Sequence, residues 1–337
     1  MNKLSKTDKI LVIAPNFLGD SVLSEIFFKN LKNFYKNSKI DVITKNNIKP
    51  IYELFPYVDN VFGYVDNSII KTRKFIKEQK YDIIFLLKRA LSSALMTFNV
   101  GASKIVGFDT QFRKFFLTNP IKYKKDEKRE AFTFLDLLSG LDIPVYDLNL
   151  EMFEDINSKN KVCDLLNKDE NDKKVLIIAK STRNDKEIKS EVWVGVINYL
   201  IEKENISIYF IGLEKEKDYY NNNIAAKIVN NKSVHNFCGT LNLKECVSLV
   251  KKMDLVLGVD TGFCHVASAF SIPTLSVFGA TSINQWGLLG KKSINFSLGL
   301  NCSPCKKPNK CKNKHACIKN VTFSNLKPNI DQLLKTI

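Results

Sequence analysis

Hydroxyls and cations gather in one loop of the second half of the chain. The segment KSTRNDK at 180–186 follows an apolar run that reads as a buried strand. Its residues of chemical interest are Ser181, Thr182, Arg183 and Lys186. Hydroxyls and cations at the carboxyl end of a strand are what a nucleotide phosphate needs. The alternative is a solvated loop in which Arg183 makes only a surface ion pair.

A second loop pairs a carboxylate with a glycine. The apolar run DLVLGV is followed by Asp260, Thr261 and Gly262, and residues 263–270 then read as an apolar helix. A helix that begins there directs unpaired N–H groups and the positive end of its dipole toward the sheet edge, which suits a diphosphate. His265 lies one turn into this helix, where it either contacts a ligand or packs in the helix interior.

The same arrangement of strand, loop and helix occurs a third time, at 9–34, with Gly19 and Asp20 in the turn. Asp20 is a candidate for acid or base chemistry, and the alternative is that it only caps the helix that follows. Three matching junctions in one chain indicate a ligand that carries phosphate.

Strands and helices alternate in both halves of the chain, as in a doubly wound α/β fold with largely parallel sheets. The predicted strands lie at 9–14, 39–44, 60–65, 81–87, 104–108, 175–179, 206–212, 233–237, 254–259 and 274–279. A length of 337 residues favours about two domains. We predict a Rossmann-like domain over 1–160, a second over 161–323 and a C-terminal helix over 324–337.

Three segments together resemble one family. LGDSVLS at 18–24, STRNDK at 181–186 and VDTGFCHVASAFSIPTLSVFGAT at 259–281 are similar to the ADP-heptose:lipopolysaccharide heptosyltransferases, glycosyltransferase family 9. The resemblance covers most of the chain in order. It implies a GT-B fold, in which two Rossmann-like domains face each other across a cleft and the last helix packs back toward the first domain. The first domain would bind the acceptor and the second the nucleotide sugar.

The resemblance also implies catalytic roles. Asp20 matches the general base of a reaction that inverts the anomeric carbon, since a sugar hydroxyl becomes a good nucleophile only as its proton is removed. Lys186, with Ser181 and Thr182, matches the residues that bind and neutralise the leaving diphosphate.

Donor binding is implied for the remaining candidates. The amides of Thr261 and Gly262 would hold the donor phosphates, and Asp260 would contact the donor sugar or its phosphates, with His265 in the same cluster. Glu214 matches the acidic residue that binds the nucleotide ribose. From the sequence alone, Glu214 is equally an ordinary residue in the first turn of a helix.

The net charge of +16 suits an anionic partner. Only five of the 51 basic residues are arginine, so part of the excess reflects a bias toward lysine. The chain has no basic segment interleaved with aromatic residues, so nucleic acid is disfavoured as the partner. Scattered lysines suit an acidic lipid surface. The start of the chain lacks a signal peptide's apolar core, and no window is apolar enough to span a bilayer. We expect a cytoplasmic protein, peripheral at the inner face of the cytoplasmic membrane.

Four of the eight cysteines, Cys302, Cys305, Cys311 and Cys317, lie in CSPCKKPNKCKNKHAC. They predict either one structural zinc site or reduced thiols or a local disulfide. Catalysis is not expected to depend on them, because the loop varies within the resembling family. No Asp-x-Asp pair is present, so we expect transfer that requires no metal or other cofactor.

The expected function is inverting transfer of heptose from ADP-L-glycero-D-manno-heptose to the inner core of lipopolysaccharide or lipooligosaccharide. The alternatives are a transferase for another nucleotide sugar, a nucleotide-sugar epimerase, and a non-catalytic sugar-nucleotide sensor on the same fold. A nucleotide-dependent dehydrogenase is disfavoured, because the first turn reads APNFLGD rather than GxGxxG. This turn also departs from that of the best-known family members, which leaves first or second heptose addition open.

Overall fold

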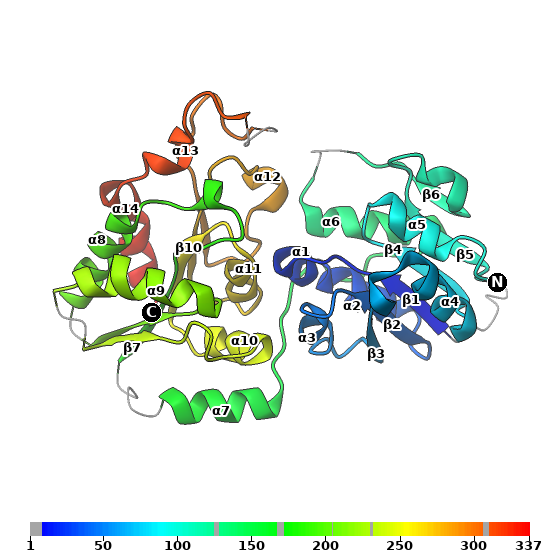
Figure 1. The fold of residues 1–337 in the computed structure, drawn as a ribbon, viewed down its shortest axis with the longest axis horizontal. Coiled ribbons are helices and arrows are strands. Elements are labelled where there is room, and N and C mark those ends of the chain that lie inside the picture. Colours follow the sequence, from blue (N-terminus) through cyan, green and yellow to red (C-terminus); the bar gives the residue numbers. More distant parts are fainter. Residues whose placement is uncertain (1–8, 125–127, 167–171, 204, 230–231, 306–309) are drawn as a thin grey trace. The chain divides into compact units, whose positions relative to one another are not determined.

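The computed structural model describes residues 9–337 apart from 125–127, 167–171, 204, 230–231 and 306–309. The chain divides into two compact units, Met1–Phe153 and Glu154–Ile337 (Figure 1). The predicted boundary at 160 lies later in the chain than this division and would cut through α7 (Ile156–Leu166). This helix packs on α10 (Leu243–Lys251), where Lys161 makes a 2.9 Å ion pair with Glu245, so it belongs to the second unit.

The first unit is built on a six-stranded parallel sheet in the order β3-β2-β1-β4-β5-β6. Its strands are β1 (Lys9–Ile13), β2 (Lys39–Thr44), β3 (Asn60–Gly63), β4 (Ile83–Leu86), β5 (Lys104–Phe108) and β6 (Asn119–Ile121). β1 lies at the centre, with Ile10 beside Ile40 of β2 and Ile83 of β4. Because both faces of the sheet are covered, the central strands are continuous apolar runs rather than alternating ones.

Connections in the two directions along this sheet place helices on opposite faces, since parallel crossovers are right-handed. The connections toward β3 hold α1 (Leu18–Leu23), α2 (Glu25–Phe34) and α3 (Lys49–Tyr52). Those toward β6 hold α4 (Ile69–Gln79), α5 (Leu91–Thr97) and the 3-10 helix η2 (Arg113–Phe116), and α4 contacts α5, which contacts η2. After β6, the helices α6 (Glu130–Leu135) and η3 (Asp136–Leu141) follow, and α6 packs on α1 and α2.

The second unit repeats the plan, with the order β12-β11-β10-β7-β8-β9. Its strands are β7 (Lys173–Ile178), β8 (Ile206–Phe210), β9 (Val234–Asn236), β10 (Leu255–Val259), β11 (Thr274–Val277) and β12 (Ser293–Phe296). Its longer helices besides α7 and α10 are α8 (Ser190–Ile201), α11 (Gly262–Ala269) and α14 (Phe323–Leu334). Short helical turns complete the unit, among them η5 (Asn184–Lys186), η6 (Glu214–Glu216), α9 (Lys217–Tyr219), α12 (Ile283–Trp286) and α13 (Ala316–Lys319).

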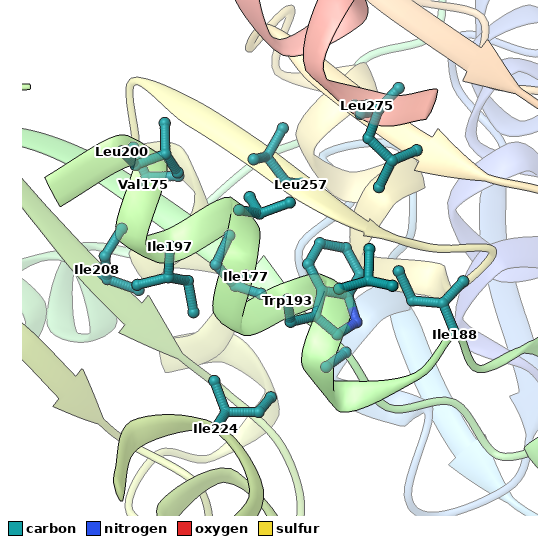
Figure 2. Packing of buried hydrophobic residues seen from close by; sticks show 14 of the residues in the cluster. Val175, Ile177, Ile188, Trp193, Ile197, Leu200, Ile208, Ile224, Leu257 and Leu275 are labelled. Atoms are coloured by element: carbon teal, nitrogen blue, oxygen red, sulfur yellow. The ribbon is translucent and has the colours of Figure 1, made fainter. Parts of the chain in front are cut away.

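The core of the second unit centres on α8. Figure 2 shows Trp193 and Ile197 of this helix lying over the strand residues Ile177 and Leu257. Trp193 is among the largest fully buried side chains of the described chain.

The C-terminal helix joins this same core. Leu326, Ile330 and Leu333 of α14 are buried in the cluster around α8, and α14 contacts α8 and β11. The spacing of these three residues forms one apolar stripe, which is used within the second unit. That the helix also packs back toward the first domain stays a prediction.

All ten predicted strands are present, so the α/β prediction is confirmed. Two strands were not predicted, β6 and β12. Both are short and lie at a sheet edge, and β6 contains Pro120, a residue that sequence patterns associate with strand ends. No helix among the described residues is long and apolar enough to cross a bilayer.

The packing of α14 predicts that Ile330→Ala lowers the unfolding free energy of the second unit by about 2–5 kcal/mol, since a fully buried isoleucine leaves a cavity. Both tryptophans of the chain, Trp193 and Trp286, lie in this unit, so urea unfolding followed by tryptophan fluorescence reports on it. Ser324→Ala, at an exposed position on the same helix, is the matched control. Equal midpoints for the two variants would contradict the assignment.

Candidate active site

The strand order of each sheet reverses beside its first strand, between β1 and β4 and between β7 and β10. Ligands of open α/β sheets bind beyond the carboxyl ends of the strands at such a reversal. The predicted site residues follow these strands: Asp20 comes after β1, Lys186 after β7 and Asp260 after β10. Each unit therefore carries candidate site residues at its own switch point.

In the second unit, the structure joins two predicted residues directly. Lys186 Nζ lies 2.6 Å from Asp260 Oδ2, and Asp260 is only 6% exposed. The parallel pairing of β7 and β10, with Ile178 beside Gly258, brings their two loops together. The Asp260 amide also donates to the carbonyl of Val277 on β11, at 3.0 Å, which fixes the backbone of the turn. A partly exposed ammonium is thus held at the strand ends by a buried carboxylate.

The helix beyond this pair offers backbone donors. Thr261 is the N-cap of α11 with an extended backbone, and its side chain makes no capping hydrogen bond. The first amides of a helix have no intrahelical acceptor, so those at Gly262 and Phe263 are available to a phosphate. His265 is buried on the same helix, which places it behind the loop.

The loop after β7 folds around Glu187. This buried carboxylate accepts from the Ser181 amide at 3.1 Å and from Lys180 Nζ at 2.7 Å. Thr182 is exposed at the loop tip. Glu187 lies one residue after the segment 180–186 and was not among the predicted site residues. An acidic residue directly after a loop rich in cations is the sequence signal that could have found it.

Arg183 is held in a bidentate pair with Asp185, at 2.9 Å for Nε to Oδ1 and 2.5 Å for Nη2 to Oδ2. This hydrogen bonding raises the pKa of Arg183. The ion-pair alternative for Arg183 therefore describes the structure, and Lys186 is the cation of this loop that meets Asp260.

Glu214 begins η6 after β8, the strand next to β7. Its carboxylate lies against Gly239, where an added Cβ would fall 1.7 Å from Glu214 Oε2. Gly239 has a φ of +74°, so two separate constraints require glycine there. Glu214 is exposed at the carboxyl edge of the sheet and lies in the first turn of a helical segment. This position is compatible with ribose binding and with an ordinary first-turn acid, the two alternatives that the sequence left open.

In the first unit, Asp20 is the third residue of α1, whose N-cap is Phe17. A carboxylate in the first turn is favoured by the helix dipole. Tyr52 lies buried nearby and donates to the Pro15 carbonyl at 3.3 Å. Burial, with a smaller contribution from the charge of Asp20, raises the pKa of Tyr52, so it stays a neutral donor beneath the loop.

Two arginines of the first unit were missed by the sequence analysis. Arg89, after β4, contacts Glu130 at 2.6 Å and lies 4.7 Å from the centre of the Tyr123 ring. Arg113, after β5, is 0% exposed, and within the part of the chain that the structure describes none of its three guanidinium nitrogens has a hydrogen-bond partner. Burial, and then the charge of Arg89, lowers the pKa of Arg113 to about 10. The signal that could have found them is that the chain has only five arginines and three of these lie just after the end of a strand.

The described residues include no group of three or more His, Cys, Asp or Glu side chains that could hold a metal ion, and all eight cysteines are free. Cys302 is exposed, Cys305 and Cys311 are half-buried, and Cys317 is buried on α13. Burial, and then the electrostatic influence of Cys302, Cys305 and Cys311, raises the pKa of the Cys317 thiol, so the four thiols of the motif lie near one another. The local disulfide is not formed, and the structural zinc site stays a prediction.

Comparisons with known proteins agree with this arrangement. Residues 69–316 match glycosyltransferase family 9 (heptosyltransferase). Lipopolysaccharide heptosyltransferase 1 of Campylobacter coli is 25% identical over 85% of this chain and 91% of its own length. The structure of the ADP-heptose lipopolysaccharide heptosyltransferase II of Escherichia coli superposes with a TM-score of 0.82, at 20% identity, over 97% of this chain and 99% of the other. A family 9 glycosyltransferase structure from Veillonella parvula gives a TM-score of 0.85, at 15% identity, over 99% of this chain and all of the other. These similarities confirm the predicted GT-B fold class.

The geometry predicts that Lys186→Ala raises the Kd for ADP about tenfold or more, because it removes a charged donor and leaves the Asp260 carboxylate uncompensated. Isothermal titration of ADP measures the change. Lys189→Ala, at an exposed position just beyond the loop, is the matched control. An unchanged Kd in Lys186→Ala would remove Lys186 from the phosphate site.

Proposed function

The chain belongs to glycosyltransferase family 9, and from this premise we propose that it transfers heptose from ADP-L-glycero-D-manno-heptose to the inner core of lipopolysaccharide or lipooligosaccharide. The reaction inverts the anomeric carbon, with Asp20 as general base. The similarity to lipopolysaccharide heptosyltransferases along nearly the whole chain supports the acceptor class.

The observation that carries the proposal is the Lys186–Asp260 pair beside the N-terminus of α11. A nucleoside diphosphate there would meet one ammonium and several backbone amides. These groups would stabilise the negative charge that develops as the diphosphate leaves, without needing to reorganise. Glu214, beyond the neighbouring strand β8, would accept hydrogen bonds from the ribose hydroxyls.

Bond changes in the transfer balance without an added reactant. The acceptor hydroxyl oxygen forms a bond to the anomeric carbon on the face opposite the leaving group, and the bond from that carbon to the diphosphate oxygen breaks. The hydroxyl proton passes to the Asp20 carboxylate, and the bonding electrons leave with ADP. Asp20 suits the role of base because it follows the first strand of its unit and carries a carboxylate that can accept the hydroxyl proton.

An anionic acceptor also suits the first unit. Among the described residues the buried guanidinium of Arg113 has no hydrogen-bond partner, and the charge of another cation, Arg89, acts on it. A buried unpaired charge is costly, and an anionic group of the acceptor would offset that cost. The net charge of +16 fits the same acceptor at the inner face of the cytoplasmic membrane.

The base assignment predicts that Asp20→Asn lowers kcat by about 10²–10⁴-fold while ADP affinity is unchanged, because only proton removal is affected. Purified protein is incubated with ADP-heptose and heptose-deficient core lipid, and ADP release and the mass gain of the acceptor are measured. Asp142→Asn, at an exposed position of the same unit, is the control. Full activity in Asp20→Asn would exclude it as the base. ADP release without acceptor gain in the wild type would favour the epimerase, and donor binding without turnover the sensor.

For Arg113, the proposal predicts opposite effects on stability and turnover. Arg113→Met removes a buried, unpaired charge, so the free protein should keep its stability or gain about 1–3 kcal/mol. The KM for the core acceptor should rise about tenfold or more, with ADP affinity unchanged. Lys36→Met, an exposed change of the same charge in the same unit, controls for net charge. A large loss of stability with an unchanged KM would make Arg113 a structural residue only.

A further inference from the structure

We propose that the outer surface of α4, α5 and η2 in the first unit docks on an anionic lipid bilayer. This inference rests on the proposed function, since it concerns how the protein reaches a lipid-anchored acceptor. This docking face consists of the cations between six exposed apolar residues and of those residues themselves, Ile69, Ile70, Leu91, Phe98, Phe112 and Phe115.

The docking face gathers large apolar side chains that a water-facing surface does not need. Ile70 and Phe112 are each 81% exposed and Phe115 is 69% exposed. Scattered exposed apolar residues are ordinary, but a contiguous set on neighbouring elements marks an interaction surface. Nearly half of the large exposed apolar residues of the described chain fall within residues 69–116.

Ring contacts and a hydrogen bond join these elements. The ring of Phe98, at the end of α5, lies 5.3 Å from that of Phe116 in η2. The Arg73 guanidinium of α4 lies 6.0 Å from the centre of the same Phe98 ring. The Leu91 amide donates to Gln111 Oε1 at 3.2 Å, which ties the start of α5 to the loop before η2. α4, α5 and the β5–β6 loop thus form one continuous surface (Figure 1).

Charge on this surface identifies the occupant. α4 carries four lysine or arginine residues and a single glutamate, and Ile70, Lys74 and Lys77 recur at helical spacing on its outer side. Lys114 lies 5.2 Å from the centre of the Phe115 ring. Cations interleaved with exposed aromatic and aliphatic side chains are typical of surfaces that lie in the headgroup region of acidic membranes.

The backbone holds Phe112 out at a cost. Gln111 and Phe112 have φ values of +54° and +59°, a left-handed conformation that bulky residues rarely adopt. The turn is fixed on both sides, by the Leu91–Gln111 bond and by the Arg113 amide, which donates to the Thr110 carbonyl at 3.0 Å. Backbone strain that presents a phenyl ring to solvent is maintained for a function outside the folded unit.

Vesicle flotation tests the docking face directly. We expect the wild type to float with vesicles of phosphatidylglycerol and phosphatidylcholine, less so at high salt, and weakly with phosphatidylcholine alone. The double variant Phe112→Ser, Phe115→Ser should lower the bound fraction about tenfold or more, because two apolar side chains no longer enter the bilayer. The matched control is Ile156→Ser with Val229→Ser, two exposed apolar residues of the second unit.

A charge pair completes the experiment. Lys74→Glu with Lys77→Glu should weaken binding to the acidic vesicles, whereas Lys36→Glu with Lys39→Glu, exposed positions elsewhere in the same unit, should have a smaller effect. Circular dichroism checks that each variant is folded. The proposal is overturned if the serine double variant floats as well as its control, if both lysine pairs act equally, or if the serine changes instead convert a dimer to a monomer in light scattering.

Transfer to a delipidated core oligosaccharide separates this inference from the proposed function. Lys74→Glu with Lys77→Glu should keep full turnover on that acceptor while losing turnover on vesicle-embedded lipid. Loss of vesicle binding with intact transfer in the wild type would overturn docking alone. Absence of transfer to either acceptor, with vesicle binding intact, would overturn the proposed function and leave the docking face in place.

Discussion

Parallel pairing at the centre of each sheet is the constraint on which the rest of the molecule depends. Parallel strands end at the same edge, so the loops after β7 and β10 must lie side by side once Ile178 is registered against Gly258. The pair of β1 with β4 does the same for the loops that carry Asp20 and Arg89. Helices on both faces make this register costly to shift, because the central strands are apolar along their whole length. The chemistry of each unit is therefore positioned by a hydrophobic core that contains none of it.

The ion pair at the second switch point explains how an ammonium stays ready for a ligand. A free lysine has many rotamers, and ordering it on ligand binding would cost entropy. Asp260, buried and fixed through its amide, holds the Lys186 ammonium within 2.6 Å before any ligand arrives. A diphosphate could bind the Lys186 ammonium while Asp260 stays in contact with it. The amides at the N-terminus of α11 would add attraction that offsets the repulsion between the phosphate and the Asp260 carboxylate. Arg183 does not share this arrangement, because Asp185 already engages two of its nitrogens.

Apolar runs in the sequence were enough to locate ten strands, because parallel strands that are buried on both faces consist of nearly continuous apolar residues. The edge strands β6 and β12 were not predicted, although the equally short and partly buried edge strands β3 and β9 were, so a short edge strand leaves only a weak signal in the sequence. Helix α14 was foreseen, but an apolar stripe says only that a helix packs, and not on which unit. The cysteine spacing predicted either a metal site or reduced thiols, and a spacing carries no information about burial, which differs between exposed Cys302 and buried Cys317. The position of Arg113 just after a strand was visible in the sequence, but its burial could not be foreseen, because arginine is usually at the surface.

The β5–β6 loop has several features that oppose folding and that a function would explain. Residues 110–116 combine a bulky residue in the left-handed region, aromatic rings exposed to solvent and a buried guanidinium that no described residue hydrogen-bonds. Each feature opposes folding by itself, and a sequence selected for stability alone would remove all three. Such conflicts collect at functional sites, where a ligand or a surface supplies the interactions that the free protein lacks. An anionic group reaching Arg113 from within and a bilayer meeting Phe112 and Phe115 from outside would relieve the same loop from both sides. A lipid-anchored, anionic acceptor is one partner with both properties.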